Sequence, residues 1–129
     1  MVRSEEYAKK VLGKEAVKQK YNSPYDIFYK GARIEVKSCK LEKEAHDYRW
    51  YLSSESRESD FFLYVLTDEK GEKILRTYLV PSAIVNKEKS YFYVVLSDED
   101  NKLEKFRIFK GVTDIDAFLD RIVLEGSSL

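Results

Sequence analysis

The run FFLYVL, residues 61–66, limits the fold more than any other stretch of this sequence. Asp60 stands before it, and the polar turn DEKGEK comes shortly after it, at residues 68–73. A strand that faces water on one side alternates apolar and polar residues, whereas a strand covered on both faces is apolar throughout. The run therefore predicts a strand that is buried on both faces.

Further strands and two helices are predicted around this run. Ser4 and the acidic residues behind it suit the start of a helix over residues 4–20, and Thr113 or Asp114 can cap a final helix. Two polar stretches are predicted as a loop and as one helical turn, residues 40–47 and 54–59 respectively. Strands are predicted over residues 25–29, 32–38, 48–53, 74–81, 90–96 and 105–109. This order predicts a single mixed α/β or α+β domain over residues 1–129.

Composition narrows the class of protein but names no partner. The chain has 129 residues, 43% of them hydrophobic and 36% charged, which is typical of one globular domain rather than of a disordered chain. The formal net charge is zero. Residues 1–50 carry 12 basic residues against 8 acidic ones, and residues 51–129 carry 11 against 15. This asymmetry fits a basic face, and it fits solvated helix charges equally well.

The single cysteine and the single histidine exclude several chemistries. Cys39 has no partner for an internal disulfide, which is compatible with a reducing cytoplasm. His46 lies in a polar stretch without a flanking signature, so a Cys–His nucleophile is disfavoured, and two such residues are too few for a zinc site. We find no signal-peptide pattern and no apolar run near the roughly 20 residues that cross a bilayer, so no membrane segment is expected.

The hairpin around Lys30-Gly31 places charged side chains inside an apolar pattern. A two-residue loop there sets Ile27 opposite Ile34, and therefore Asp26 opposite Glu35. Strand alternation puts the two isoleucines on one face and the two acids on the other. The charged face holds Asp26, Glu35 and Lys37.

Two carboxylates that face each other favour a bound cation. Directly opposed side chains lie about 5 Å apart, and like charges there are destabilising. A divalent cation removes this penalty, and Mg²⁺ prefers oxygen ligands while keeping several waters. The backbone carbonyl of Val36 can add a ligand. Lys37, two residues beyond Glu35, would then help to deprotonate a metal-bound water or stabilise charge on a phosphate.

A purely structural interpretation of the same residues stays open. Lys37 can simply neutralise Glu35 on the solvent face of an amphipathic hairpin. Similar acid-x-lysine triplets occur in polar turns at residues 68–70 and 100–102. Only the triplet at residues 35–37 is embedded in a predicted strand and preceded by an opposed aspartate, and this context favours the metal site.

The stretch YDIFYKGARIEVKSCK, residues 25–40, resembles the core hairpin of the PD-(D/E)XK nuclease superfamily, which has the restriction-endonuclease-like fold. The resemblance implies an α+β fold with an N-terminal helix, a central mixed sheet that carries the catalytic hairpin, and a C-terminal helix. It implies Asp26 and Glu35 as metal ligands and Lys37 as the catalytic lysine. Many members add a glutamate from the preceding helix, and Glu5 fits that position best.

The similarity continues downstream, although no glutamine follows the lysine at an assignable position and the helix after the third strand is hard to find. Residues 49–68 and 74–85 are similar to the later strands of Holliday-junction-resolvase-like members and of homing or restriction-type members. A helix usually follows the third strand of this fold, and residues 54–59 are short for it. The resemblance therefore covers roughly residues 4–85, and its diagnostic part is the hairpin.

The implied function is a Mg²⁺-dependent or Mn²⁺-dependent endonuclease that hydrolyses DNA phosphodiester bonds with metal-activated water. Candidate contacts to the DNA backbone are Lys9, Lys10, Lys30, Arg33 and Lys40. A homodimer would bring a second site by symmetry. The aromatic stretch at residues 90–96 is a candidate for its interface, although core packing explains that stretch as well. Two alternatives stay open: an inactive module of the same fold that binds nucleic acid or a protein partner, and a stabilising scaffold subunit.

Overall fold

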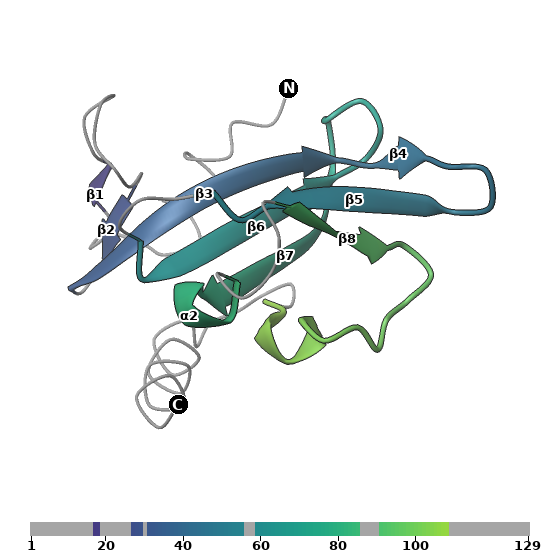
Figure 1. The fold of residues 1–129 in the computed structure, drawn as a ribbon. Helices are drawn as coiled ribbons and strands as arrows, with labels where there is room; N and C mark the ends of the chain where they lie inside the picture. Colours follow the sequence, from purple (N-terminus) through teal and green to yellow (C-terminus); the bar gives the residue numbers. More distant parts are fainter. Residues whose placement is uncertain (1–16, 19–26, 30, 56–58, 86–90, 109–129) are drawn as a thin grey trace.

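A computed structural model describes residues 17–18, 27–29, 31–55, 59–85 and 91–108 of the chain. Strands dominate this part of the protein, together with a short α-helix and a 3₁₀ turn (Figure 1). The elements are β1 (Val17–Lys18), β2 (Ile27–Tyr29), β3 (Ala32–Lys40), β4 (Glu42–Lys43), β5 (Tyr48–Ser53), β6 (Phe61–Thr67), β7 (Ile74–Pro81), α2 (Ser82–Val85), β8 (Tyr91–Val95) and the 3₁₀ turn η1 (Glu104–Phe106).

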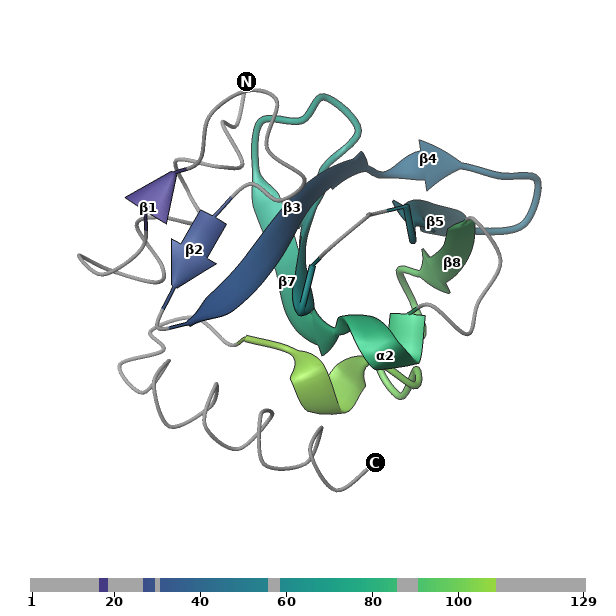
Figure 2. The same cartoon turned by 60° about the vertical axis from the view of Figure 1, so that its left-hand side comes forward.

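These strands form two sheets. The larger has the order β1-β2-β3-β6-β7, and the smaller has the order β4-β5-β8 and lies beyond the end of β3 (Figures 1 and 2). Strands β3 and β6 run parallel, and every other pair of these strands is antiparallel. Parallel strands need a crossover connection, and here the chain forms β4 and β5 on its way from β3 to β6.

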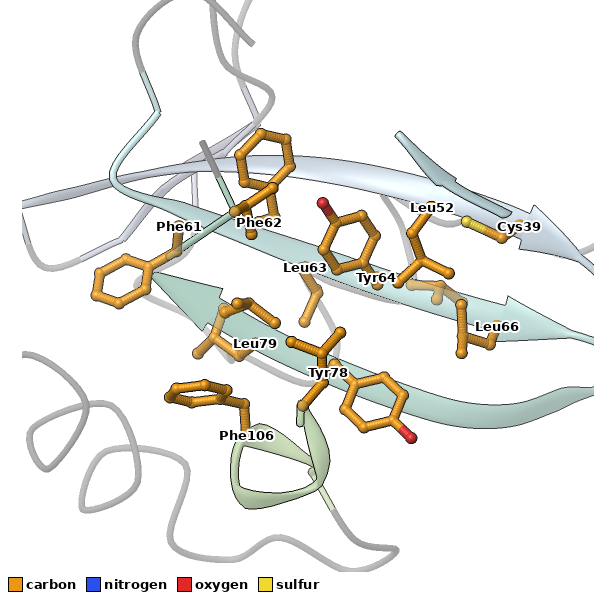
Figure 3. Packing of buried hydrophobic residues seen from close by; sticks show 14 of the residues in the cluster. Cys39, Leu52, Phe61, Phe62, Leu63, Tyr64, Leu66, Tyr78, Leu79 and Phe106 are labelled. Atoms are coloured by element: carbon orange, nitrogen blue, oxygen red, sulfur yellow. The ribbon is translucent and has the colours of Figure 1, made fainter. Parts of the chain in front are cut away.

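The core gathers around β6 and β7 (Figure 3). All seven residues of β6 are buried, which confirms the prediction of a strand covered on both faces. Leu63 and its register partner Leu79 are fully buried. Trp50 and Leu52 of the smaller sheet are fully buried in the same cluster, and the Trp50 indole nitrogen donates to the Thr67 carbonyl at 2.7 Å. That hydrogen bond ties the two sheets together.

Most of the predicted strands are confirmed. Strands β5 and β7 have the predicted bounds, and β8 ends one residue earlier than predicted, while residue 90, the predicted start, lies outside the described part. Strand β3 starts as predicted and extends two residues further, through Lys40. Strand β2 lies within the predicted residues 25–29, of which 25 and 26 are outside the described part.

The helix predicted over residues 4–20 is wrong at Val17–Lys18, which form β1 and pair with β2. A β-branched valine suits a strand better than a helix. The edge of β2 offers this segment backbone hydrogen bonds, and such pairing readily overrides the weak helix propensity of a short segment. The other residues of this predicted helix lie outside the described part of the chain, as does the final helix from Thr113 or Asp114.

The strand predicted over residues 105–109 is also wrong over its described residues, 105–108, while residue 109 lies outside the described part. Glu104–Phe106 forms a 3₁₀ turn in which the amide of Phe106 donates to the carbonyl of Leu103. Both of these apolar side chains are almost fully buried, so their packing favours a tight turn over an extended strand. The only remnant of strand pairing among the described residues there is an isolated bridge from Arg107 to β7.

Three connections also differ from expectation. The loop predicted over residues 40–47 contains β4, which pairs with β5. The helical turn predicted over residues 54–59 is missing at both described ends, while residues 56–58 lie outside the described part. Helix α2 was not predicted; it starts where Pro81 ends β7, and its first residue, Ser82, is a residue type that suits helix starts.

Candidate functional site

The β2–β3 hairpin has the predicted register. Tyr29 lies opposite Ala32, and Ile27 lies opposite Ile34. The two isoleucines are fully buried, which confirms the predicted core face of the hairpin. Several predicted site residues lie outside the described residues, namely Glu5, Lys9, Lys10, Asp26 and Lys30. The opposition of Asp26 and Glu35 therefore stays a prediction.

Glu35 and Lys37 lie next to each other on the other face of β3. The Lys37 ammonium nitrogen is 3.3 Å from a Glu35 carboxylate oxygen. Their side chains are 16% exposed for Glu35 and 25% exposed for Lys37, so the pair is largely buried but still reaches solvent. The predicted same-face placement of the acid and the lysine is thus seen in the structure.

Two stacked aromatic rings lie beside this ion pair. In the parallel register, Glu35 neighbours Phe62 and Lys37 neighbours Tyr64. The two rings are fully buried and stack with centroids 5.5 Å apart and planes 5° apart. An apolar neighbour lowers the local dielectric, which strengthens every electrostatic contact of the two charged groups. The sequence pointed to the burial of these rings, but not to their place beside the charges.

Tyr64 also connects this region to the smaller sheet. Its hydroxyl donates to the Ser53 carbonyl at 2.7 Å, and its ring meets Phe92 edge to face at 5.9 Å. Burial raises the pKa of the Tyr64 hydroxyl well above its usual range, and the nearby Cys39 adds to the increase. Tyr64 is therefore a neutral hydrogen-bond donor that holds the end of β5 over β6.

Arg33, near the start of β3, and Asp60, just before β6, form a bidentate contact. The guanidinium donates to both Asp60 oxygens, at 3.1 and 3.0 Å, and the Arg33 amide donates to one of them at 2.8 Å. In return the Asp60 amide donates to the Arg33 carbonyl at 2.7 Å. The hydrogen bonds from Arg33 lower the pKa of Asp60, although partial burial opposes this.

This contact bears on two predictions. It joins residues 27 positions apart, so no local sequence pattern could predict it. The one signal in the sequence is that Asp60 directly precedes the apolar run. It anchors β3 two residues before Glu35. It also gives Arg33 a carboxylate partner, while the Arg33 side chain remains 41% exposed. A contact from Arg33 to nucleic acid stays a prediction.

The remaining described site residues lie further along β3. Val36 is half-buried and packs against the core cluster. Lys40 is exposed, and its methylene groups cover Gly71, where an added Cβ would lie 2.9 Å from the Lys40 Cε atom. Cys39 is buried, and this raises the pKa of its thiol to about 12, although Lys37 lowers it slightly. A protonated, buried thiol is a poor nucleophile, in agreement with the sequence interpretation.

Within the described residues, no group of three or more histidine, cysteine, aspartate or glutamate side chains forms a metal cluster. Of the predicted carboxylate ligands, Glu35 lies in the described part of the chain, whereas Asp26 and Glu5 lie outside it. No helix in the described part of the chain is long and apolar enough to cross a membrane.

The mixed sheet with its β2–β3 hairpin fits the predicted α+β class of fold. The predicted restriction-endonuclease-like α+β class is confirmed by the solved structures that this chain matches. One of them is a bacterial homing endonuclease, I-Ssp6803I, with a TM-score of 0.62. The match covers 98% of this chain and 93% of that chain at 15% sequence identity, so it shows a shared fold. No protein-family model and no curated protein sequence matches the chain.

Proposed function

We propose that this chain is a divalent-metal-dependent endonuclease of the PD-(D/E)XK type that hydrolyses DNA phosphodiester bonds. The observation that supports this most is the Glu35–Lys37 pair on β3, at 3.3 Å and largely buried, within a fold shared with a homing endonuclease. An acid and a lysine beside buried aromatic rings have the charges that phosphodiester chemistry uses.

The donor set fits a hard cation. Carboxylate and carbonyl oxygens are the ligands that Mg²⁺ and Mn²⁺ prefer. Glu35 would be one ligand and the Val36 carbonyl another, and Asp26 would be a third if the hairpin register continues by one pair beyond Ile27. A cation bound there supplies Lewis-acid activation of water and stabilises negative charge on the phosphate. Glu5 is a further candidate from the preceding segment.

Lys37 has two roles that follow from its position. Without a cation or substrate, its ammonium group balances the Glu35 carboxylate. With a phosphodiester in place, the same ammonium group stabilises the negative charge that develops on the reacting phosphate. The packed rings of Phe62 and Tyr64 restrict where the pair can move, so the lysine is positioned before the substrate arrives.

Contacts to the DNA backbone would come from basic residues around the hairpin. Lys40 is exposed at the end of β3, and Arg33 retains partial exposure beside Asp60. Lys9, Lys10 and Lys30 complete the proposed set. Each lysine or arginine that neutralises a phosphate makes binding more sensitive to salt. We further propose a homodimer, which cuts two strands with two equivalent sites, and a reducing cytoplasm as its compartment.

The test is a cleavage assay on supercoiled plasmid and on a branched DNA junction with Mg²⁺ or Mn²⁺. The variants are Lys37→Ala, Glu35→Gln and Asp26→Ala. We expect each to lower the cleavage rate by about 100-fold or more, because each removes a charge used at the reacting phosphate. Lys43→Ala, at an exposed lysine of β4, is the matched control and should cut like the wild type.

Metal binding gives a second measurement. Mg²⁺ or Mn²⁺ should raise the melting temperature of the wild type by mass action, and Glu35→Gln should abolish this increase. Equal cleavage by all variants would refute the catalytic roles. Binding of DNA without cleavage, and without any effect of metal, would instead support the inactive module of the same fold.

A further inference from the structure

Strand β8 is an edge of the smaller sheet. It pairs with β5 on one side, and no other strand in the described part of the chain pairs with its second side. An edge of this kind carries backbone amides and carbonyls that can pair with another strand. The residues of β8 decide which partner this edge suits.

The hydrogen-bond pattern shows which backbone groups lie at the open edge. The amide of Leu96 donates to the carbonyl of Tyr48 at 2.8 Å, so these two residues form a hydrogen-bonded pair. Such pairs alternate with non-hydrogen-bonded pairs along an antiparallel ladder. Tyr93 lies three positions away, opposite Tyr51, and Tyr91 lies opposite Ser53, so both fall in non-hydrogen-bonded pairs. Their amides and carbonyls therefore point away from β5.

The side chains at this edge are large and apolar. Tyr91 and Tyr93 are 61% and 54% exposed. Both rings contact Tyr51, at centroid distances of 6.0 and 6.4 Å, and the Tyr51 hydroxyl donates to Glu44. The strand has the sequence YFYVV, without a charge or a proline. Charged residues and prolines usually protect exposed edges from pairing, and β8 has neither, so this edge is open to pairing.

Charge decides against nucleic acid as the partner of this face. The Arg49 guanidinium lies 4.2 Å from the Tyr93 ring centre, but two hydrogen bonds, at 2.9 and 2.8 Å, commit it to Asp47. Glu42 lies opposite Arg49 across β4 and β5, and Glu44 bonds Tyr51. Three acids around one arginine repel a phosphate backbone, whereas tyrosine rings that contact one another edge to face or at a tilt suit a protein surface.

We propose that the partner is a second copy of this chain, joined through antiparallel pairing of the two β8 edges. A two-fold axis at Tyr93 sets Tyr93 opposite its own copy and Tyr91 opposite Val95 of the partner subunit. Every such pair is uncharged, and aromatic and β-branched side chains pair favourably across strands. The strand is thus complementary to itself, as a two-fold interface requires. The two small sheets would become one six-stranded sheet.

This inference specifies the interface of the homodimer in the proposed function, but it does not depend on catalysis. The contact area of one edge strand and a few rings is small, so we expect a reversible dimer that dissociates on dilution. Sedimentation equilibrium over a range of protein concentrations should show a monomer–dimer equilibrium for the wild type. Tyr93→Lys should shift it to the monomer, because it places two like charges face to face.

Leu75→Lys is the matched control, because Leu75 is 41% exposed on β7 and lies outside the interface. It should dimerise like the wild type. A wild type that stays monomeric at every concentration would overturn the proposal, as would Tyr93→Lys that dimerises normally or Leu75→Lys that dissociates equally. Tyrosine variants that keep the wild-type oligomeric mass but bind DNA more weakly would assign this face to nucleic acid, and that result would also overturn the proposed dimer.

A cross-link tests the geometry if Tyr93→Lys does not fold. Opposed residues in a hydrogen-bonded pair have Cα atoms about 5.5 Å apart, within disulfide range. Tyr93→Cys should therefore give an oxidised, covalent dimer, while Leu75→Cys should not. Absence of a Tyr93→Cys dimer under oxidation would refute the two-fold axis. A wild type that stays monomeric at every concentration and still cleaves DNA would refute the interface alone and leave the proposed nuclease activity standing.

Discussion

Arg33 shows how one residue can anchor the start of a strand. Its amide, its carbonyl and its guanidinium all bond Asp60, so backbone and side chain act together. The carbonyl of Asp60 in turn accepts a hydrogen bond from the Ser82 amide at 2.9 Å, which extends the contact to α2. Glu35 lies two residues further along β3, so the contact between Arg33 and Asp60 helps to fix its position.

Asp60→Asn should lower the free energy of unfolding by about 1 kcal/mol, because the two side chains are about two-fifths exposed and water weakens their contact. The effect should depend on pH. Arg33 lowers the pKa of Asp60 in the folded protein, so the stabilisation is present above the unfolded pKa of about 4. It should be lost as the pH falls through the lower, folded pKa.

Urea unfolding of wild type and Asp60→Asn at several pH values measures this difference. We expect the gap between the two proteins to be constant near neutral pH and to close below pH about 4. Ser59→Ala, next to Asp60 in the chain, is a control that should not change the pH dependence. A gap that is independent of pH would contradict the role of the Asp60 charge.

At the scale of elements, β3 changes its buried face along its length. Near its start, Ile34 is buried and Arg33 is partly exposed. Near its end, Cys39 is buried although it lies on the same face as Glu35, while Ser38 and Lys40 are exposed. The smaller sheet lies near that end, and Figure 3 shows Cys39 and Leu52 toward the same end of the core. One strand thus offers its charged face partly to solvent and partly to a second sheet.

Two glycines in turns allow the cost of a left-handed backbone to be measured. Gly31 and Gly71 have φ of +83° and +74°, where an L side chain is strained. Nothing lies within 4 Å of a Cβ added at Gly31, whereas one at Gly71 meets the end of the Lys40 side chain. Each change to alanine should cost about 1 kcal/mol, and Lys40 can move aside at little extra cost.

Urea unfolding of Gly31→Ala and Gly71→Ala checks this expectation. The two losses should agree within about 0.5 kcal/mol, and Gly71→Asn should lose less than Gly71→Ala, because asparagine tolerates positive φ. A loss at Gly71→Ala that is much larger than at Gly31→Ala would mean that Lys40 is held in place. That result would make Lys40 a structural residue rather than a free cation for DNA.

Local patterns account for most of the elements but not for all. The strand at residues 48–53 was predicted in a stretch whose aromatic side chains suit a sheet, and the hairpin register followed from the turn at Lys30-Gly31. Val17–Lys18 and Glu104–Phe106 were mispredicted because a neighbouring strand edge and two buried side chains outweighed local propensity. Short segments are where such competition is closest.

At the scale of the whole molecule, Arg76 joins the larger sheet to the smaller one. This β7 residue is 5% exposed, and its guanidinium donates to the Leu96 carbonyl and, at 3.5 Å, to the Asp98 carbonyl. It also lies over the Trp50 ring at 5.2 Å. A carboxylate oxygen of Glu99 is 3.9 Å away, but that side chain is 75% exposed. The buried contacts, rather than the ion pair, hold the turn after β8.

Arg76→Met should therefore cost about 1–3 kcal/mol, because it leaves buried carbonyls without a donor. Glu99→Gln, which removes the partner charge at the surface, should change the free energy of unfolding by less than about 0.5 kcal/mol. Urea unfolding measures both values. Equal losses in the two variants would show that the ion pair contributes more than the carbonyl contacts.

The sequence by itself determined most of the strands, the phase of the hairpin and the shared face of Glu35 and Lys37. These features depend on alternation, turn residues and apolar runs, which act between near neighbours in the chain. Only the tertiary structure decided that β6 lies parallel to β3, that Asp60 holds Arg33 and that tyrosines of β8 remain exposed. Those contacts join distant segments, and a local pattern can show that a face is apolar without showing what will cover it.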